Sequence, residues 1–146
     1  MKKILRMIAV STVGGIVLLA VVYLFKWLHV SKAYDLLLNF EYVPVLGALH
    51  HFELARFAFH FGTCIVSTIV LYYIVKALHI EHRLLSYIIP ITLGSAVLYF
   101  LSALTDAPPA PFDFVSWGIW VFGHLIYSII IAYGMKFYVL HNKRKM

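Results

Sequence analysis

Four long stretches of this chain contain no Asp, Glu, Lys or Arg. They cover residues 7–25, 57–75, 84–105 and 114–135. At about 1.5 Å per residue, a helix of this length crosses about 30 Å of hydrocarbon. In lipid the backbone must satisfy its own hydrogen bonds, and the stretches are longer than barrel strands, so they predict helices. With their flanking residues, they predict membrane spans at about 7–28, 56–78, 84–105 and 114–138.

The composition fits a bilayer better than water. Apolar residues make up 63% of the chain and charged residues only 12%, with a mean hydropathy of +0.91, whereas soluble domains are roughly a quarter charged. A length of 146 residues leaves room for one domain. We therefore predict an all-α integral membrane protein, a four-transmembrane-helix bundle in a single membrane domain.

Positive charge is distributed unevenly around these spans. The excess of 12 Lys and Arg over 6 Asp and Glu would suggest nucleic acid binding in a soluble protein, but here much of it flanks the apolar stretches. The N-terminal residues, the 76–83 connection and the run 142–145 hold most of it, whereas the other face has only Lys26, Lys32 and Arg56. By the positive-inside rule, both termini are predicted to be cytoplasmic. The lipid bilayer, and no nucleic acid, is the expected partner.

The two outer connections differ in character. Residues 29–56 remain apolar over much of their length, so this loop is predicted to be partly helical and to lie in the membrane interface. The second connection contains Pro108, Pro109 and Pro111, which fix φ and remove backbone donors. It is predicted to be stiff and non-helical.

Polar side chains recur at helical spacing in the second and fourth spans. In the second span they are Glu53, Arg56, His60 and Ser67, with Thr63 or Cys64 between the last two. In the fourth span the same spacing groups Trp117, Trp120, His124, Tyr127 and Ser128. Steps of three and four place each set on one helix side, which should face the bundle rather than lipid. From these sides we predict a polar seam that consists of His60, His124, Asp113, Glu53, Arg56, Ser67, Tyr127 and Ser128.

His60 and His124 are the strongest functional candidates, because an ionisable side chain is expensive in hydrocarbon. One interpretation is a proton-responsive or ligand-holding site, since imidazole changes charge near neutral pH. The other is that each ring simply hydrogen-bonds a neighbouring helix. Both interpretations stay open at the level of sequence.

A haem b held between the two histidines is a further alternative. Counting residues along each span puts His60 and His124 roughly 10 Å apart in depth, whereas ligation from both sides needs them nearly level. Helix tilt would recover part of this gap.

Outside the spans, His50, His51 and Glu53 have spacings that could supply metal ligands together with His60, but no recognised metal motif. A solvated or interfacial cluster is the favoured interpretation, with no metal bound. Glu53 and Arg56 lie three residues apart and are predicted to form an ion pair at the helix end.

The second half of the chain, roughly residues 60–146, resembles the YagU-like family of bacterial inner-membrane proteins. The resemblance rests on a histidine opening an apolar span, a proline-rich loop with Phe-Asp, and a Gly-His pair in the last span: His60, Pro108, Pro109, Phe112, Asp113, Gly123, His124 and Leu125. The pattern would include a further histidine in the third span, where this chain has Tyr99. The resemblance implies a multi-pass protein of the bacterial cytoplasmic membrane and importance for His60, Asp113 and His124. It supplies no reaction.

Nothing in the sequence predicts an enzyme, because it contains no phosphate-binding glycine loop, no nucleophile elbow and no carboxylate within a span. The first hypothesis is a small membrane protein that handles protons or a small solute, or responds to pH, through the histidines. A second is an assembly subunit, in a homo-oligomer or with a membrane partner, motivated by the small residues Gly14, Gly15, Gly94 and Ser95. A third is a haem- or quinone-associated subunit.

Overall fold

The computed structural model describes residues 2–140, and the regular structure of that range is entirely helical. Four long segments dominate it: α1 (Lys2–Trp27), α3 (Glu53–Ala77), α4 (Leu85–Leu98) with its 3-10 extension η2 (Tyr99–Leu104), and α5 (Phe114–Tyr133) with its π-helical extension η3 (Gly134–Leu140). Two short helices, α2 (Ala33–Leu37) and η1 (Leu46–Leu49), lie in the first outer loop. The proline-rich connection of residues 105–113 is non-helical, as predicted.

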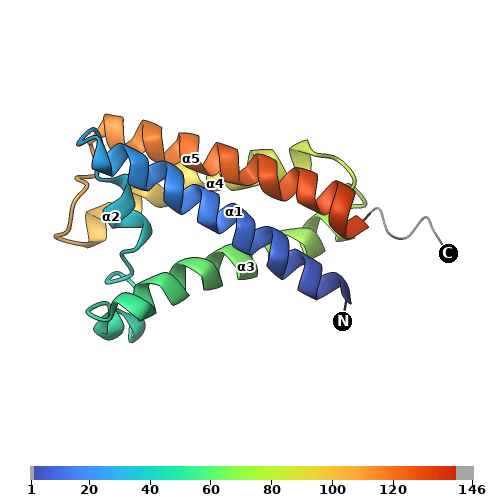
Figure 1. Ribbon diagram of the computed structural model, residues 1–146, viewed down its shortest axis with the longest axis horizontal. Coiled ribbons are helices and arrows are strands. Elements are labelled where there is room, and N and C mark those ends of the chain that lie inside the picture. Colours follow the sequence, from blue (N-terminus) through green and yellow to red (C-terminus); the bar gives the residue numbers. More distant parts are fainter. Residues whose placement is uncertain (1, 141–146) are drawn as a thin grey trace.

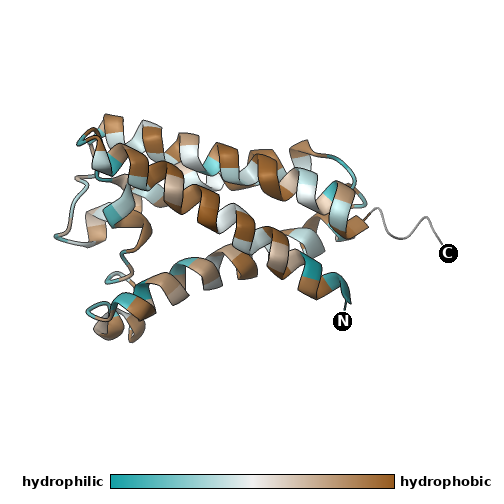
Figure 2. Cartoon of the chain, in the orientation of Figure 1, coloured by the Kyte–Doolittle hydropathy of each residue, from teal (hydrophilic) through white to brown (hydrophobic). Residues whose placement is uncertain are grey.

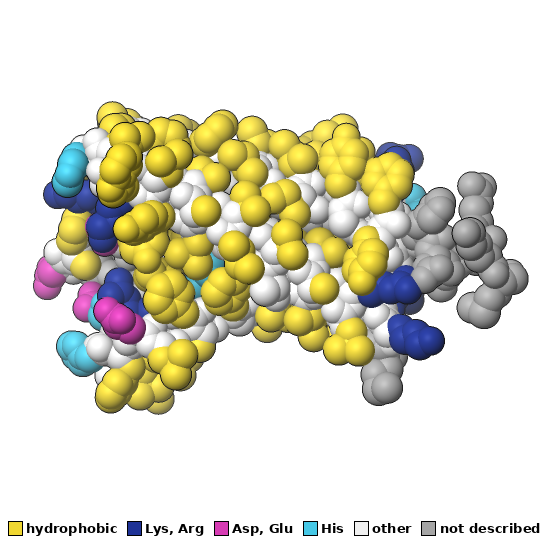
Figure 3. Space-filling view, viewed as in Figure 1, with side chains coloured by type: hydrophobic (Ala, Val, Ile, Leu, Met, Phe, Trp, Pro, Cys, Tyr) yellow, Lys and Arg dark blue, Asp and Glu magenta, His cyan; other side chains and the backbone are white. Residues whose placement is uncertain are grey.

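The four long segments are each long and apolar enough to cross a membrane, as predicted. Apolar side chains cover the middle of the molecule, and charged side chains gather at its two ends (Figure 3). The same separation is visible along the ribbons, where hydrophilic residues concentrate at helix ends and connections (Figure 2). The beginning of α1 and the end of the chain's last helical segment lie at the same end of the bundle (Figure 1). The basic run 142–145 lies outside the described residues.

The packing centres on α1, which contacts both α3 and α5, while α4 packs along α5 (Figure 1). Glycines allow these close approaches. A Cβ on Gly14 would lie 2.9 Å from the Tyr127 ring, and one on Gly15 would lie 3.1 Å from the Phe61 ring. The small residues that suggested an external assembly surface therefore include two that serve contacts within the bundle.

The remaining pair of neighbours, α3 and α4, touch at few positions. A short connection, residues 78–84, joins them at one end, and α3 diverges from the other helices toward the opposite end (Figure 1). The segment that contains α2 fills the resulting wedge, with Leu36, Leu37 and Phe40 buried. The first outer loop is thus partly helical, as predicted, but its first half packs inside the bundle because the diverging helices leave apolar surface to cover.

Candidate functional site

A cavity of about 380 Å³ lies between α3 and α4. Its wall is mainly apolar and includes Leu18 of α1, Leu36 and Leu37 of α2, and Ile91 and Leu98 of α4. Its polar lining comes from α3, α4, α5 and the first outer loop: His60, Thr63, Cys64, Ser67, Ser95, His124, Tyr127 and Tyr42. A mostly apolar wall with a few polar groups is typical of small-molecule sites.

His60 enters the cavity from α3, and its ring is 2% exposed. Its Nε2 atom lies 3.1 Å from the Gly15 carbonyl oxygen of α1. Because a carbonyl only accepts, Nε2 carries the hydrogen, and Nδ1 of the neutral ring is an acceptor. Nδ1 has no hydrogen-bond partner within residues 2–140. The second Nε2 neighbour is the Cys64 sulfur, at 4.0 Å.

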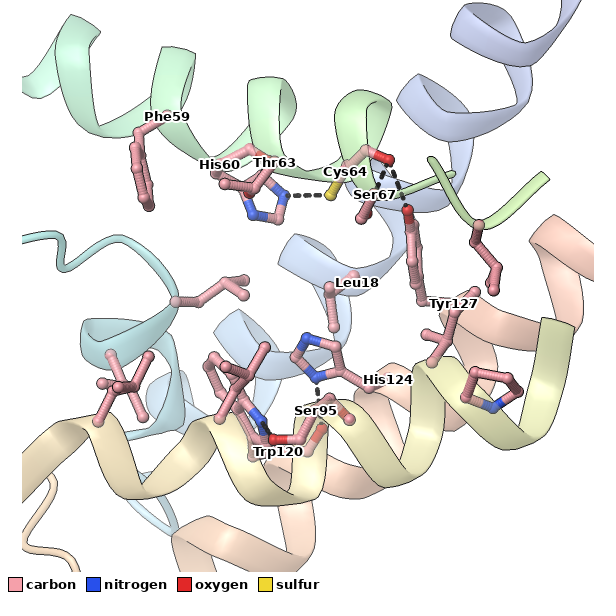
Figure 4. A pocket seen from close by; sticks show the side chains of 18 of the residues that line it. Leu18, Phe59, His60, Thr63, Cys64, Ser67, Ser95, Trp120, His124 and Tyr127 are labelled. Carbon is pink, nitrogen blue, oxygen red and sulfur yellow. Dashed lines mark hydrogen bonds between the residues drawn. The ribbon is translucent and has the colours of Figure 1, made fainter. Parts of the chain in front are cut away.

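His124 enters the same cavity from α5, so the two rings approach it from different helices (Figure 4). Its Nδ1 atom donates to the Trp120 carbonyl at 2.8 Å, one turn earlier on the same helix. The Trp120 indole packs against the imidazole, with 4.4 Å between ring centroids, and its own N–H donates to the Ser95 carbonyl of α4 at 2.7 Å. The His124 ring is therefore held in position, and Nε2 is its remaining acceptor.

The wall beside the histidines is closed by a hydroxyl cluster that links α5 to α3. The Tyr127 hydroxyl donates to the Cys64 carbonyl at 3.1 Å, and the Thr68 hydroxyl donates to the same carbonyl at 2.8 Å. The two hydroxyl oxygens lie 3.1 Å apart. This cluster bridges the bundle at a depth where the side chains of α3 and α5 face each other across the cavity (Figure 4).

The predicted polar seam divides into two groups. His60, Ser67, His124 and Tyr127 line the cavity. The other four members lie elsewhere: Ser128, Asp113, Glu53 and Arg56.

Each of these four has a structural setting of its own. Ser128 faces α4, where its hydroxyl lies 3.2 Å from that of Thr92. Asp113 caps α5 by accepting the Ser116 N–H at 3.0 Å, and this hydrogen bond lowers the pKa of its carboxyl. Glu53 is exposed in the first turn of α3.

The predicted ion pair between Glu53 and Arg56 is wrong. Arg56 Nε instead donates to the Leu38 carbonyl at 3.1 Å, and the ion pairs of residues 2–140 do not include it. Three residues along a helix bring the two side chains within reach, but the buried α2 segment offers the guanidinium a fixed acceptor.

The outer histidines do not assemble into a metal centre with His60. His50 lies 3.5 Å from a Glu41 carboxylate oxygen, and His60 is in the cavity. Among residues 2–140, no three His, Cys, Asp or Glu side chains are grouped as metal ligands.

Sequence reasoning missed three contributors to the site. Leu36 and Leu37 form part of the wall, although their apolar loop was predicted to lie in the interface. The backbone carbonyl of Gly15 holds His60. Tyr42 lines the outer end, where burial raises the pKa of its hydroxyl. Only the apolar character of the loop offered a signal, because a carbonyl contact leaves no trace in residue type.

No family model matches this chain, and no curated protein and no solved structure matches it either. The resemblance to the YagU-like family stays a prediction, and the site is interpreted from its own geometry.

Proposed function

We propose that this chain is a non-enzymatic protein of the bacterial cytoplasmic membrane that handles a small, mostly apolar molecule, which it holds in the cavity between α3 and α4. The observation that supports this most strongly is that His60 and His124, on different helices, line the same cavity. Each neutral ring donates its one N–H to a backbone carbonyl, and its other ring nitrogen is an acceptor. An acceptor left unpaired in a mostly apolar cavity is costly, so a ligand with a hydrogen-bond donor gains affinity at this position.

The cavity also has a suitable size and character. Its volume of about 380 Å³ falls in the range of about 300–1,000 Å³ that is usual for small-molecule sites. Among the polar lining groups, the two imidazoles are the ones whose ordinary pKa lies near neutral pH. A second candidate function, pH response, follows from this, because a protonated ring would place an additional N–H in an apolar space.

Binding by the purified protein tests the main proposal. The protein in lipid nanodiscs would be titrated with 1-pyrenemethanol, a fluorescent molecule small enough for the cavity. Gly94→Leu should abolish binding, because Gly94 lines the cavity and has open space beside it. Gly118→Leu is the matched control, since Gly118 also has open space but lies outside the cavity lining. Binding that resists Gly94→Leu would contradict the proposal.

The orientation proposed here has both termini in the cytoplasm. Its support is the basic character of the end that holds Lys3, Arg6 and Lys136, compared with the acidic residues Asp35 and Glu41 in the first outer loop. Reporter enzymes fused to the C terminus and inserted into the 42–50 loop should give cytoplasmic and external signals, respectively. The reverse pattern would invert the topology.

The two other hypotheses are decided by measurements on the same preparation. A Soret absorbance band would establish a haem-associated subunit, and native mass spectrometry would establish a homo-oligomer or a partner. A monomeric, colourless protein that binds the fluorescent molecule would leave the small-molecule proposal standing alone.

A further inference from the structure

We infer that the ligand of this cavity enters sideways from the bilayer, between α3 and α4, and is a lipid-soluble alcohol or phenol whose hydroxyl group donates to one of the two histidines. This inference rests on the proposed function and specifies the route and the chemical class of the ligand. Three observations support it: where the cavity is exposed, what closes its outer end, and which hydrogen-bonding groups line it.

The cavity opens at mid-depth in the membrane. Its exposed lining residues are Thr63 and Ser67 near the middle of α3, and Pro90, Gly94 and Leu98, which centre on the middle of the third span. Its buried lining includes Leu18 of α1 and Trp120 and Tyr127 of α5. Because α3 and α4 touch at few positions, this opening faces hydrocarbon. A molecule dissolved in the bilayer reaches it without crossing water.

The outer end of the cavity is covered by the α2 segment. Arg56 of α3 donates to the Leu38 carbonyl at 3.1 Å, and Asn39 donates to the Thr105 hydroxyl, just after η2, at 3.2 Å. The segment is thus fastened to both walls of the wedge. The Phe40 ring also stacks on Phe59 of α3, with centroids 4.8 Å apart. A solute from the outer aqueous side would have to displace these contacts, whereas a lipid-soluble molecule would not.

The lining is rich in acceptors and poor in donors. In their neutral form both imidazoles retain an acceptor nitrogen, because their N–H groups are held by the Gly15 and Trp120 carbonyls. The Trp120 N–H and the Tyr127 hydroxyl are also committed to backbone carbonyls.

The other lining hydroxyls also donate to backbone carbonyls, with two exceptions, Ser67 and Tyr42. Thr63 donates to the His60 carbonyl at 2.8 Å. Ser67 lies 3.2 Å from the Cys64 carbonyl, which two other hydroxyls approach more closely, so its hydrogen is less firmly held. The Tyr42 hydroxyl, at the outer end, makes no hydrogen bond within residues 2–140.

These groups select the ligand by its donors. A ketone, ester or ether offers only acceptors and would leave both ring nitrogens unpaired, which is costly in an apolar site. An alkylammonium group has donors, but its charge is expensive at the depth of the opening. A neutral hydroxyl on an apolar body donates its one hydrogen to one of the rings without this cost.

A matched pair of ligands tests the inference: 1-pyrenemethanol and its methyl ether, which differ in the hydroxyl hydrogen and one methyl group. Dissociation constants would be measured by fluorescence with the protein in nanodiscs, with partition into protein-free nanodiscs subtracted. At a pH where imidazole is neutral, the alcohol should bind at least about fivefold more tightly than the ether, since one buried hydrogen bond contributes about 1 kcal/mol or more.

Variants then assign the preference to the rings. Removal of the accepting ring, by His60→Leu or His124→Leu, should bring the ratio of the two constants close to one by weakening the alcohol, whereas Gln at the same position, which keeps an acceptor, should restore part of it. If the histidine variants do not fold, the wild-type ratio still decides the question. Equal binding of alcohol and ether would overturn the hydroxyl assignment and leave the proposed function intact, whereas binding of neither would overturn both.

The lateral route has its own readout. Nitroxide groups on lipid acyl chains, placed at mid-chain or near the headgroup, should differ in how strongly they quench the bound pyrene. Stronger quenching by the mid-chain label is expected, and stronger quenching by the headgroup label would overturn the route through the α3–α4 opening.

Discussion

The close approach of α1 to the end of α5 gives a sharp test of the helix packing on which the cavity depends. A Cβ on Gly134 would lie 2.4 Å from Val10 Cγ1 and 2.9 Å from Cγ2, whereas ordinary contacts of this kind are 3.4–4 Å. Either Val10 or the backbone of η3 must therefore move by about 1 Å. Overpacking of this kind typically costs about 1–3 kcal/mol, and we expect Gly134→Ala to lower the free energy of unfolding by that amount.

The compensating change is Val10→Ala. It removes both clashing methyl groups and leaves the Val10 Cβ position at 3.2 Å, a tight contact that requires only a small adjustment. The loss of unfolding free energy in the double variant should therefore be smaller than the summed losses of the two single variants, by about 1 kcal/mol or more. Interaction energies of this size are common for contacting residues in double-mutant cycles.

Reversible unfolding in mixed micelles, followed by circular dichroism, measures all four proteins of this cycle. Gly118→Ala serves as the control, because Gly118 has nothing within 4 Å of its would-be Cβ and so reports the gain in helix propensity alone. Additive effects in the cycle, or a Gly134→Ala protein as stable as the Gly118→Ala control, would refute the packing of α1 against η3.

Two further predictions concern the outer end of the bundle. Asp113→Ala should cost about 1 kcal/mol of stability at neutral pH, because it removes the cap that accepts the Ser116 N–H. The lowered pKa of Asp113 means that this stabilisation is complete above the ordinary carboxyl pKa and is lost as pH falls through the folded-state value. Unfolding curves of wild type and variant should thus converge in acid, and a constant difference would count against the cap. Arg56→Met removes the donor to the Leu38 carbonyl, so amide exchange in 33–42 should accelerate at least severalfold by mass spectrometry. Unchanged protection there would show that the α2 segment is held by its apolar contacts alone.

The sequence alone was sufficient to predict four helices long and apolar enough to cross a membrane, because hydrocarbon admits long uncharged segments only as structures that satisfy their own backbone. It also indicated that His60 and His124 avoid lipid, for the same energetic reason. Both conclusions depend on the bilayer as solvent and on nothing about how one helix meets another.

The tertiary structure decided which polar residues share a site. Helical spacing placed His124, Tyr127 and Ser128 on one side of the fourth span, but the rotation and divergence of its neighbours turn His124 and Tyr127 to the cavity and Ser128 to Thr92. Counting residues along straight spans predicted different depths for His60 and His124. In the structure α3 is inclined to the other helices, and both rings line one cavity (Figure 4). Angles between helices come from side-chain contacts at positions such as Gly14 and from the buried α2 segment, and these contacts join residues far apart in the chain, where hydropathy and periodicity carry no information.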